Sequence, residues 1–347
     1  MKTLQSRIVP LLVLSLLFSS GAVAADLYRF LKEIPIGGEG GWDYLSVDSS
    51  AHRLYVSHAT KVVVIDLTKD EVVGEIPDTP GIHGIALAPD LKRGFTSNGR
   101  EGKAGMVDLE TLRTIAKVET GENPDAILYE PGHREVYVFN GRGKSATIFA
   151  AATGTLIATL PLPGKPEFAE VDQAAGLVYD NIEDKNEVVV IDAKTHQIVH
   201  EWPIAPGEEA TGMAIDLQHH RLFIGCSNRT LVMMDSSTGK VVATVPVGSG
   251  VDAVAFDPGT QLAFTSDGGT GTVTIAHEDS PDQLTVVQTL ATERSARTMV
   301  LDPATHKIYL ASARFAAPPE NPPPNAPRQR PAMIPGSFKV LIYGMEH

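Results

Sequence analysis

The chain has 347 residues, of which 20% are charged, and its formal net charge is −13 at pH 7. An acidic chain repels nucleic acid and anionic lipid at long range, so nucleic acid is not an expected partner. The one cysteine, Cys226, excludes an internal disulfide, and we expect its thiol to be a small buried core residue.

Residues 1–24 have the composition of a secretory signal peptide. Lys2 and Arg7 form a basic start, an apolar stretch covers residues 8–18, and the small residues 22–24 match a cleavage site. The apolar stretch is too short to span a bilayer. We therefore expect cleavage at the end of this segment, a mature protein without a membrane span, and a periplasmic location.

Residues 212–247 contain four short apolar runs separated by clusters of turn-forming residues. The runs are Gly212–Asp216, Arg221–Cys226, Thr230–Asp235 and Lys240–Val247. This alternation predicts a four-stranded antiparallel meander. Such a sheet leaves two edges and two faces uncovered, so it is not stable alone and needs neighbours of the same kind.

The same unit recurs along the chain, and the residue that ends its first predicted strand serves as an anchor. The seven anchors are Asp48, Ala88, Glu130, Asp172, Asp216, Asp257 and Asp302, at successive spacings of 40, 42, 42, 44, 41 and 45 residues. A period near 40 with four strands per unit is typical of a β-propeller. We predict an all-β fold in which residues 25–347 form a single seven-bladed β-propeller with four-stranded antiparallel blades.

The seventh copy supplies only three predicted strands, and the strand predicted over Leu27–Ile34 has no blade of its own. The simplest closure makes Leu27–Ile34 the outer strand of blade seven, which removes the open edge of the ring. Because a closed ring has no edge that requires a partner, we expect a monomer.

A proline-rich segment, residues 316–335, interrupts blade seven between its second and third strands. Prolines at this density exclude a helix or a strand and predict extended, polyproline-like coil. Long loops in compact domains are often functional, so the segment could cover the channel. A surface excursion without a role is the alternative, and the sequence leaves both interpretations open.

The second predicted strands end in related tetrapeptides. These are Tyr55–His58, Phe95–Asn98, Tyr137–Asn140, Val178–Asn181, Phe264–Asp267 and Tyr309–Ser312. The pattern resembles the YVTN-repeat, or YncE-like, β-propeller family of mostly exported bacterial and archaeal proteins. The resemblance covers essentially the whole mature chain and implies the fold. It implies no particular activity, because members of the family differ in function. A link of some relatives to single-stranded DNA does not suit this acidic composition.

One face of the predicted ring gathers polar residues. The position five residues before each anchor begins an inner strand and is occupied by Asp43, His83, Asp125, Glu167, Thr211, Asp252 and Arg297. The ends of the second strands reach the same face and bring His58, Asn98, Asn140, Asn181 and Asp267. Trp42 is expected to add an aromatic edge, and Arg314 arrives from blade seven. We predict a ligand-binding channel mouth composed of these residues.

Four of these residues, Asp43, His83, Asp125 and Glu167, come from consecutive blades and are candidate metal ligands. Carboxylates held close together are costly to ionise unless a cation, a donor or water compensates them. Oxygen ligands with one histidine suit Ca²⁺, Mg²⁺ or Mn²⁺, and Zn²⁺ would be suited if both His58 and His83 were ligands. The alternative is a set of polar residues that face a wet channel without binding a ligand.

The chain contains no haem-attachment, metalloprotease, nucleophile-elbow or phosphate-loop motif. We therefore predict a binding or scaffold propeller without catalysis, which holds a protein or a small molecule at the channel mouth. The alternative is a metal-dependent hydrolase that resembles the gluconolactonase group. A divalent cation at the mouth would then activate a lactone, with His83 or His58 as the general base. A third interpretation is a docking subunit of a redox enzyme.

Overall fold

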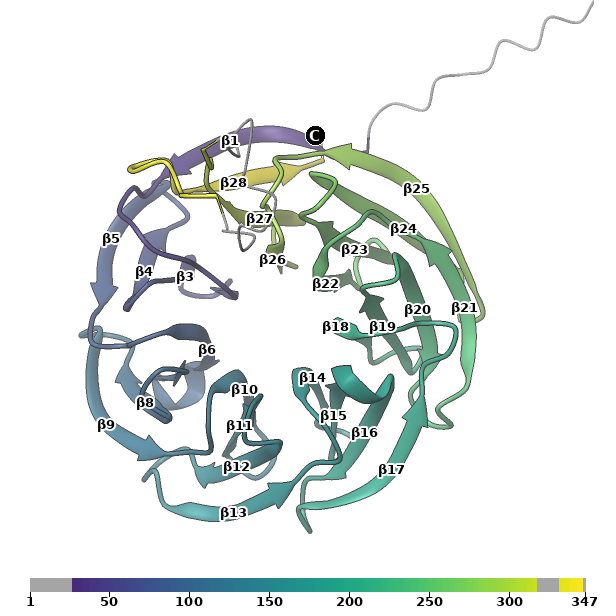
Figure 1. Ribbon diagram of the computed structural model, residues 1–347, viewed down its shortest axis with the longest axis horizontal. Helices are drawn as coiled ribbons and strands as arrows, with labels where there is room; N and C mark the ends of the chain where they lie inside the picture. The colour runs from purple at the N-terminus through teal and green to yellow at the C-terminus, as the bar shows by residue number, and fades with distance from the viewer. Residues whose placement is uncertain (1–26, 317–330, 346–347) are drawn as a thin grey trace, which may run out of the picture.

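The computed structural model describes residues 27–316 and 331–345, and within them it contains 28 strands in seven four-stranded sheets. Figure 1 shows the sheets arranged as blades around a central axis. This confirms the predicted seven-bladed β-propeller. The predicted signal peptide, residues 1–24, lies outside the described residues. No helix among the described residues is long and apolar enough to cross a membrane.

Each blade is an antiparallel meander whose strands run from the channel outward. Blade one comprises β2 (Leu45–Asp48), β3 (Arg53–His58), β4 (Lys61–Asp66) and β5 (Glu71–Ile76). Blade two comprises β6 (Ile82–Ala88), β7 (Arg93–Asn98), β8 (Lys103–Asp108) and β9 (Arg113–Glu119). Blade three comprises β10 (Pro124–Glu130), β11 (Glu135–Asn140), β12 (Ser145–Ala150) and β13 (Leu156–Pro161).

The next three blades repeat this order. Blade four comprises β14 (Pro166–Asp172), β15 (Leu177–Ile182), β16 (Glu187–Asp192) and β17 (Gln197–Pro203). Blade five comprises β18 (Ala210–Asp216), β19 (Arg221–Cys226), β20 (Thr230–Asp235) and β21 (Val241–Pro246). Blade six comprises β22 (Val251–Asp257), β23 (Leu262–Asp267), β24 (Thr272–Ser280) and β25 (Gln283–Ala291). Two short 3-10 turns, Pro89–Leu91 and Glu183–Lys185, lie in blades two and four.

Blade seven joins the two ends of the described chain. Its strands, from the channel outward, are β26 (Thr298–Asp302), β27 (Lys307–Ser312), β28 (Lys339–Gly344) and β1 (Arg29–Pro35). β1 lies antiparallel to β28, with Ile34 opposite Val340. The predicted closure by the N-terminal strand is therefore confirmed.

The core of the molecule lies between the blades. The two middle strands of each blade are covered on both faces, so they consist of nearly continuous apolar runs such as Val62–Ile65. Tyr55 and Val64 of blade one, for example, pack against Ile85 and Val107 of blade two. The outer strands have one face in water and alternate in exposure, as β25 does. Burial of these interfaces holds the blades in a ring.

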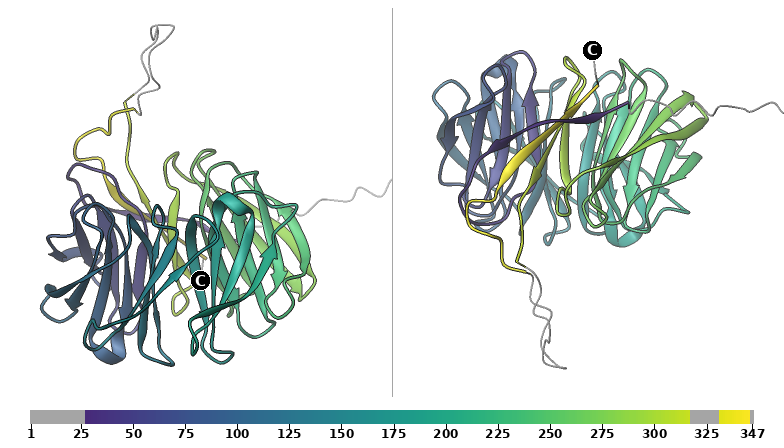
Figure 2. Two further views of the ribbon diagram at one scale, coloured as in Figure 1. Left: turned by 60° about the horizontal axis from the view of Figure 1, so that its bottom comes forward. Right: turned by 90° about the horizontal axis from the view of Figure 1, so that it is seen from above.

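The flanks of the proline-rich segment lie between β27 and β28, while residues 317–330 are outside the described part of the chain. The flanks differ from the predicted coil, because Phe315 pairs with Met333 in an antiparallel bridge and the N–H of Ala316 donates to the Ala332 carbonyl over 2.8 Å. None of these residues is proline, so their N–H groups remain available for pairing. Figure 2 shows the paired flanks standing out from one face of the disc.

Candidate functional site

The inner strands begin at one face of the disc, and those of blades two to six carry a β-bulge there. In blades two, three and four the pairing register shifts between Ile82 and Ile85, between Pro124 and Ile127, and between Pro166 and Ala169. A bulge redirects the side chains beside it. The residues within these three bulges include His83, Asp125 and Glu167, which gather at the end of the channel as predicted.

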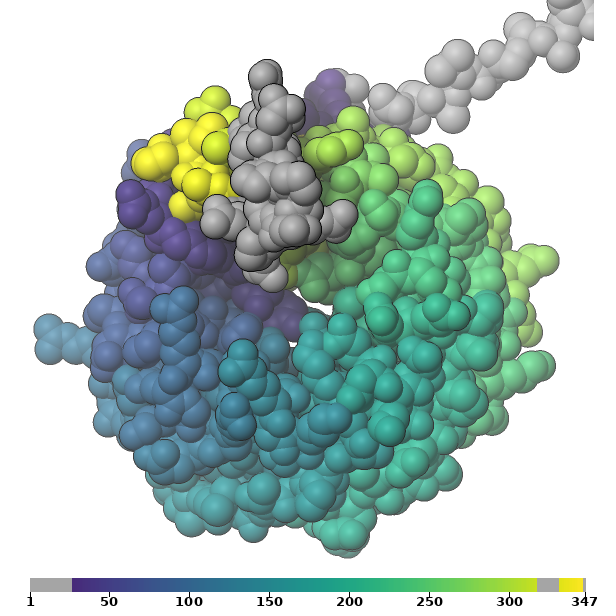
Figure 3. Space-filling model, viewed as in Figure 1, coloured from purple at the N-terminus to yellow at the C-terminus, as the bar shows by residue number. Residues whose placement is uncertain are grey.

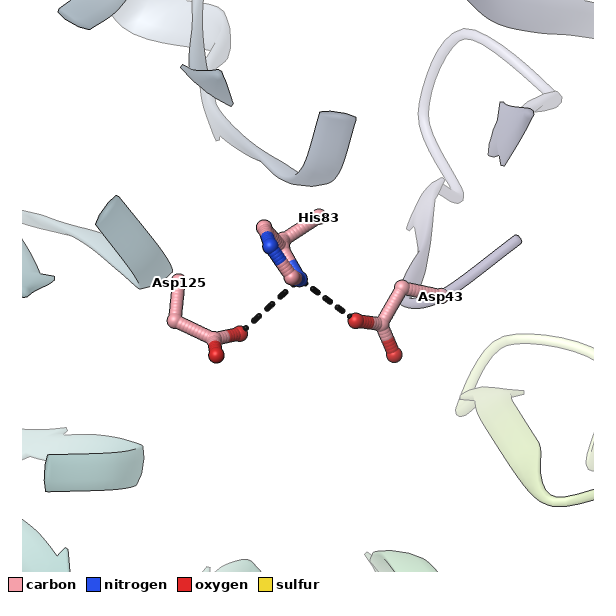
Figure 4. Close-up of side chains that lie close together, drawn as sticks. All are labelled: Asp43, His83 and Asp125. Atoms are coloured by element: carbon pink, nitrogen blue, oxygen red, sulfur yellow. Dashed lines mark hydrogen bonds and ion pairs between the residues drawn. The ribbon is translucent and has the colours of Figure 1, made fainter. Parts of the chain in front are cut away.

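His83 lies between two carboxylates from neighbouring blades (Figure 4). Its Nδ1 atom is 2.7 Å from Oδ2 of Asp43 and 3.2 Å from Oδ1 of Asp125. Burial by itself would lower the pKa of His83, but the hydrogen bond to Asp43 and the nearby Asp125 carboxylate raise the pKa above its usual value. Three blades therefore meet at one imidazole.

Two cations compensate part of the remaining negative charge. Arg297 lies 3.3 Å from Oδ1 of Asp43, also contacts the carboxylate of Asp252, and donates to the Trp42 carbonyl over 2.8 Å. On the other side, Lys165 lies 2.9 Å from Oε2 of Glu167 and also contacts Glu183 outside the ring of acids. These contacts hold Asp43, Asp252 and Glu167 in place.

The acids at the mouth are short of positive charge. Burial, followed by repulsion from Asp43, raises the pKa of Asp125 well above its usual value, although His83 opposes the shift. Burial and repulsion from Asp125 likewise raise the pKa of Glu167, against the effect of Lys165. Carboxyls that resist ionisation in this way would be stabilised as anions by an added cation.

The donor atoms of Asp43, His83 and Asp125 fit a single metal ion. One oxygen from each carboxylate and one imidazole nitrogen all lie within 4.8 Å of one another. Glu167, the fourth predicted ligand, is not part of this group and is paired with Lys165 instead. Two carboxylate oxygens with one imidazole nitrogen suit Mn²⁺ or Zn²⁺.

A cavity of about 630 Å³ lies above these residues. It is lined by Gly41, Trp42, Asp43, Ala59, Gly81, Ile82, His83, Gly99, Arg100, Glu122, Asn123, Arg142 and Arg297. A second cavity, of about 620 Å³, shares Trp42 and Arg297 with the first and continues beneath the flanks of the proline-rich segment, against Phe315 and Met333. The centre of this face is hollowed in Figure 3. The mouth is therefore a polar chamber beside a more apolar one.

An aromatic bridge crosses the channel. Tyr44 of blade one reaches Phe168 of blade four, with a ring-centre distance of 5.3 Å. Gly84 makes room for it, because a Cβ atom there would lie 3.2 Å from the Tyr44 ring. Burial and the surrounding acids raise the pKa of Tyr44 well above its usual value, so its hydroxyl stays neutral. Tyr44 and Phe168 also line a further cavity of about 340 Å³, together with Glu170.

The second-strand residues are not placed at the mouth as predicted. Asn98, Asn140, Asn181 and Asp267 are all fully buried. Asn140 bonds to the Gly121 amide and to the Ser145 carbonyl, at 3.0 and 3.1 Å. Asn98 donates a hydrogen bond to Glu101, and Asn181 donates to the carbonyls of Thr211 and Gly212. Asp267 accepts hydrogen bonds from Thr265, Thr272 and Thr274. These side chains connect strands and loops within the protein.

His58 is also buried, and it differs from His83 in having no charged partner. Its ring stacks on Phe338 at a centre distance of 4.2 Å, and neither ring nitrogen has a hydrogen-bond partner among the described residues. Burial, with a smaller contribution from Lys61, lowers the pKa of His58 to about 4. His58 is therefore a neutral core residue, and the prediction of a mouth base at this position is wrong.

The predictions that Trp42 and Arg314 lie at the channel mouth have different outcomes. Trp42 lines both cavities, although its ring is largely buried against Phe338. Arg314 lies on the flank of the proline-rich segment with an exposed side chain, and it lines neither cavity. Sequence reasoning missed Tyr44, which reaches Phe168 across the channel, and Lys165, the cation beside Glu167. Tyr44 follows a predicted ligand directly, which was the available signal.

Fold and site together define a seven-bladed β-propeller with an acidic channel mouth. No family model matches the chain. A structure of Kuenenia stuttgartiensis hydrazine synthase is similar, with a TM-score of 0.70 and 15% identity over 79% of this chain and 94% of that chain, which is a likeness of fold alone.

Two curated proteins match part of the sequence. Each is called uncharacterized protein YncE, one from Salmonella typhimurium and one from Salmonella typhi, and each is 22% identical over 109 residues. The match spans 31% of this chain and 31% of each relative. Together with the fold, this similarity fits a YncE-like seven-bladed β-propeller.

Proposed function

We propose that this propeller is a binding protein that holds a divalent cation at its channel mouth through Asp43, His83 and Asp125. The observation that carries the proposal is the convergence of three donor atoms within 4.8 Å, in a group of acids whose negative charge Arg297 and Lys165 compensate only in part. The ion would lie where Nδ1 of His83 now approaches the two carboxylates. The cavity of about 630 Å³ above it leaves room for a small molecule or a segment of a partner protein.

The location of the protein is part of the same proposal. The basic start, apolar stretch and small-residue site of residues 1–24 support export to the periplasm. The described residues contain no helix that could span a membrane.

Replacing Asp125 with Asn should weaken Mn²⁺ binding at least about tenfold, a loss that even outer-shell partners of metal sites produce. The amide keeps the size of the side chain but removes its charge. Isothermal titration of the full chain with MnCl₂ measures the effect. The control is Glu122→Gln, which changes a cavity-lining carboxylate outside the three-residue group and should leave the affinity unchanged. Equal affinities of Asp125→Asn and wild type would contradict the proposal.

A second candidate function, lactone hydrolysis, is favoured by the way Asp43 holds His83. The contact uses Nδ1, and Nε2 of His83 has no hydrogen-bond partner among the described residues. A neutral Nε2 next to the cavity could take a proton from water that attacks a carbonyl carbon. In this alternative His83 is a base rather than a metal ligand. Acid release from a panel of lactones, followed in a pH-stat with wild type and His83→Gln, tests it, and the absence of turnover in wild type would exclude it for those lactones.

A further inference from the structure

A second group of metal-ligating side chains lies on the opposite face of the disc, between blades five and six. Asp216 ends the inner strand β18, His219 follows in the turn, and Glu278 comes from β24 of the next blade. Nδ1 of His219 is 2.6 Å from Oδ2 of Asp216 and 3.5 Å from Oε1 of Glu278. One donor atom from each residue lies within 4.8 Å of the other two.

Glu278 occupies a position that recurs in blades one to six, and the residues at this position in the other five blades are uncharged. In six blades, the residue that follows the buried part of the third strand donates its backbone N–H to a backbone carbonyl in the turn between the first and second strands. These residues are Leu67, Leu109, Ala151, Ala193, Ser236 and Glu278, in blades one to six. Leucine, alanine or serine satisfies the packing in the first five. A glutamate is therefore not required by the fold, and residues that break a local rule tend to mark functional sites.

The carboxylate of Glu278 is buried without a hydrogen-bond donor among the described residues. The residue is 1% exposed, and neither carboxylate oxygen accepts a hydrogen bond from a described N–H or O–H group. The nearest guanidinium, that of Arg221, is engaged elsewhere, with Asp235 at 2.9 Å, Asp282 at 3.2 Å and the His219 carbonyl at 3.0 Å. Burying an unpaired carboxylate is costly, so an additional positive charge or a proton must be present in the cluster.

We propose that Asp216, His219 and Glu278 form a divalent transition-metal site that takes an ion such as Zn²⁺ and ties blade five to blade six. Two carboxylate oxygens and one imidazole nitrogen are a donor set that Zn²⁺ accepts, with water in the remaining position. His219 is partly exposed, which leaves the ion a route from solvent. This site shares no residue with the channel mouth and does not depend on the function proposed there.

Blade three provides a matched control within the same chain. Glu130 and His133 have the same spacing as Asp216 and His219, and Nδ1 of His133 is 3.0 Å from Oε2 of Glu130. The residue of blade four that corresponds to Glu278 is Ala193. Blade three therefore has the acid–histidine pair without the third ligand, and we expect it to bind no metal.

The test uses the full chain with Asp43→Asn and Asp125→Asn, so that the channel mouth does not contribute. After removal of metal with a chelator, calorimetric titration with ZnCl₂ should show one equivalent. Glu278→Ser, which installs the blade-five residue, should lose that equivalent and the rise in melting temperature that Zn²⁺ causes. His133→Ala should retain both. His219→Ala provides a second loss variant if Glu278→Ser folds poorly.

The absence of Zn²⁺ binding in the Asp43→Asn/Asp125→Asn background would overturn the site and favour a proton shared by Asp216 and Glu278. Binding that survives both Glu278→Ser and His219→Ala would also overturn it. Wild type separates the two proposals, because it should bind two equivalents if both are correct. If only the channel-mouth proposal fails, wild type binds one equivalent and loses it with Glu278→Ser.

Discussion

Replacing Ile34 with Asp is expected to destabilise the protein by about 3–5 kcal/mol, the sum of a lost core side chain and a buried charge. Ile34 lies in β1, is 2% exposed, and packs with Val340 and Ile342 in the cluster that joins blade seven to blade one. β1 is the strand that closes the ring, so a charge there weakens the pairing of the two chain ends. Urea unfolding followed by circular dichroism measures the change.

Val72→Asp is the control for this prediction. Val72 lies in β5, the outer strand of blade one, and is 46% exposed. The same introduced charge should cost no more than about 1 kcal/mol there, because water still reaches it. Equal unfolding midpoints of Ile34→Asp and Val72→Asp would show that stability does not depend on closure of the ring by β1.

Asp180→Ser is expected to stabilise the protein by about 1–3 kcal/mol at neutral pH, the usual cost of an unsatisfied buried polar group. Asp180 is fully buried in β15, and neither carboxyl oxygen has a hydrogen-bond partner among the described residues. At the matching place in two other blades, the side chain is a buried hydroxyl, that of Thr96 and that of Thr265. A small hydroxyl side chain is thus one that this architecture already accommodates there.

The stabilisation should grow with pH. Burial, and then repulsion from Glu167, raises the pKa of Asp180 well above its usual value, so the folded protein retains a proton that the unfolded chain releases above about pH 4. The contribution of Asp180 to stability is therefore present below about pH 4 and is lost as the pH rises toward the folded pKa.

Urea unfolding at pH 4.5 and pH 8 measures this dependence. Asp180→Ser should gain little over wild type at the lower pH and most at the higher pH. Asp78→Ser, whose side chain is 74% exposed, should show no comparable gain at either pH. A constant difference between Asp180→Ser and wild type would mean that Asp180 does not titrate differently on folding.

The ring was predictable because its repeat is visible as a spacing. Each unit has the same order of apolar runs and turns, so anchors such as Asp48 and Asp216 fix both the number of blades and the start of every inner strand. The convergence of Asp43, His83 and Asp125 follows from this, because the starts of inner strands meet at one end of the channel.

The second-strand residues were misplaced because a position in a strand does not fix the face to which the side chain points. A shift of one residue along a strand turns the side chain to the other side. Asn98 and His58 point into the protein, whereas Gly99 and Ala59, one residue later, line the cavity. Alignment of the repeats correctly placed these residues at the channel-mouth end of the second strands, but it did not show that their side chains point into the protein rather than into the cavity.

Two further features needed the three-dimensional arrangement. Tyr44 and Phe168 meet because blades one and four lie across the channel from each other, which a period along the chain does not indicate. Glu278 became a candidate ligand only when the neighbouring blade brought Asp216 and His219 to it. Its sequence signal was nevertheless present, since it is the one glutamate in a series of leucine, alanine and serine.

The most direct test of the channel-mouth proposal is an anomalous difference map from crystals of the full chain grown with MnCl₂. We expect a manganese peak at bonding distance from Oδ2 of Asp43, Nδ1 of His83 and Oδ1 of Asp125. A map that shows manganese elsewhere on the protein and none among these three residues would contradict it.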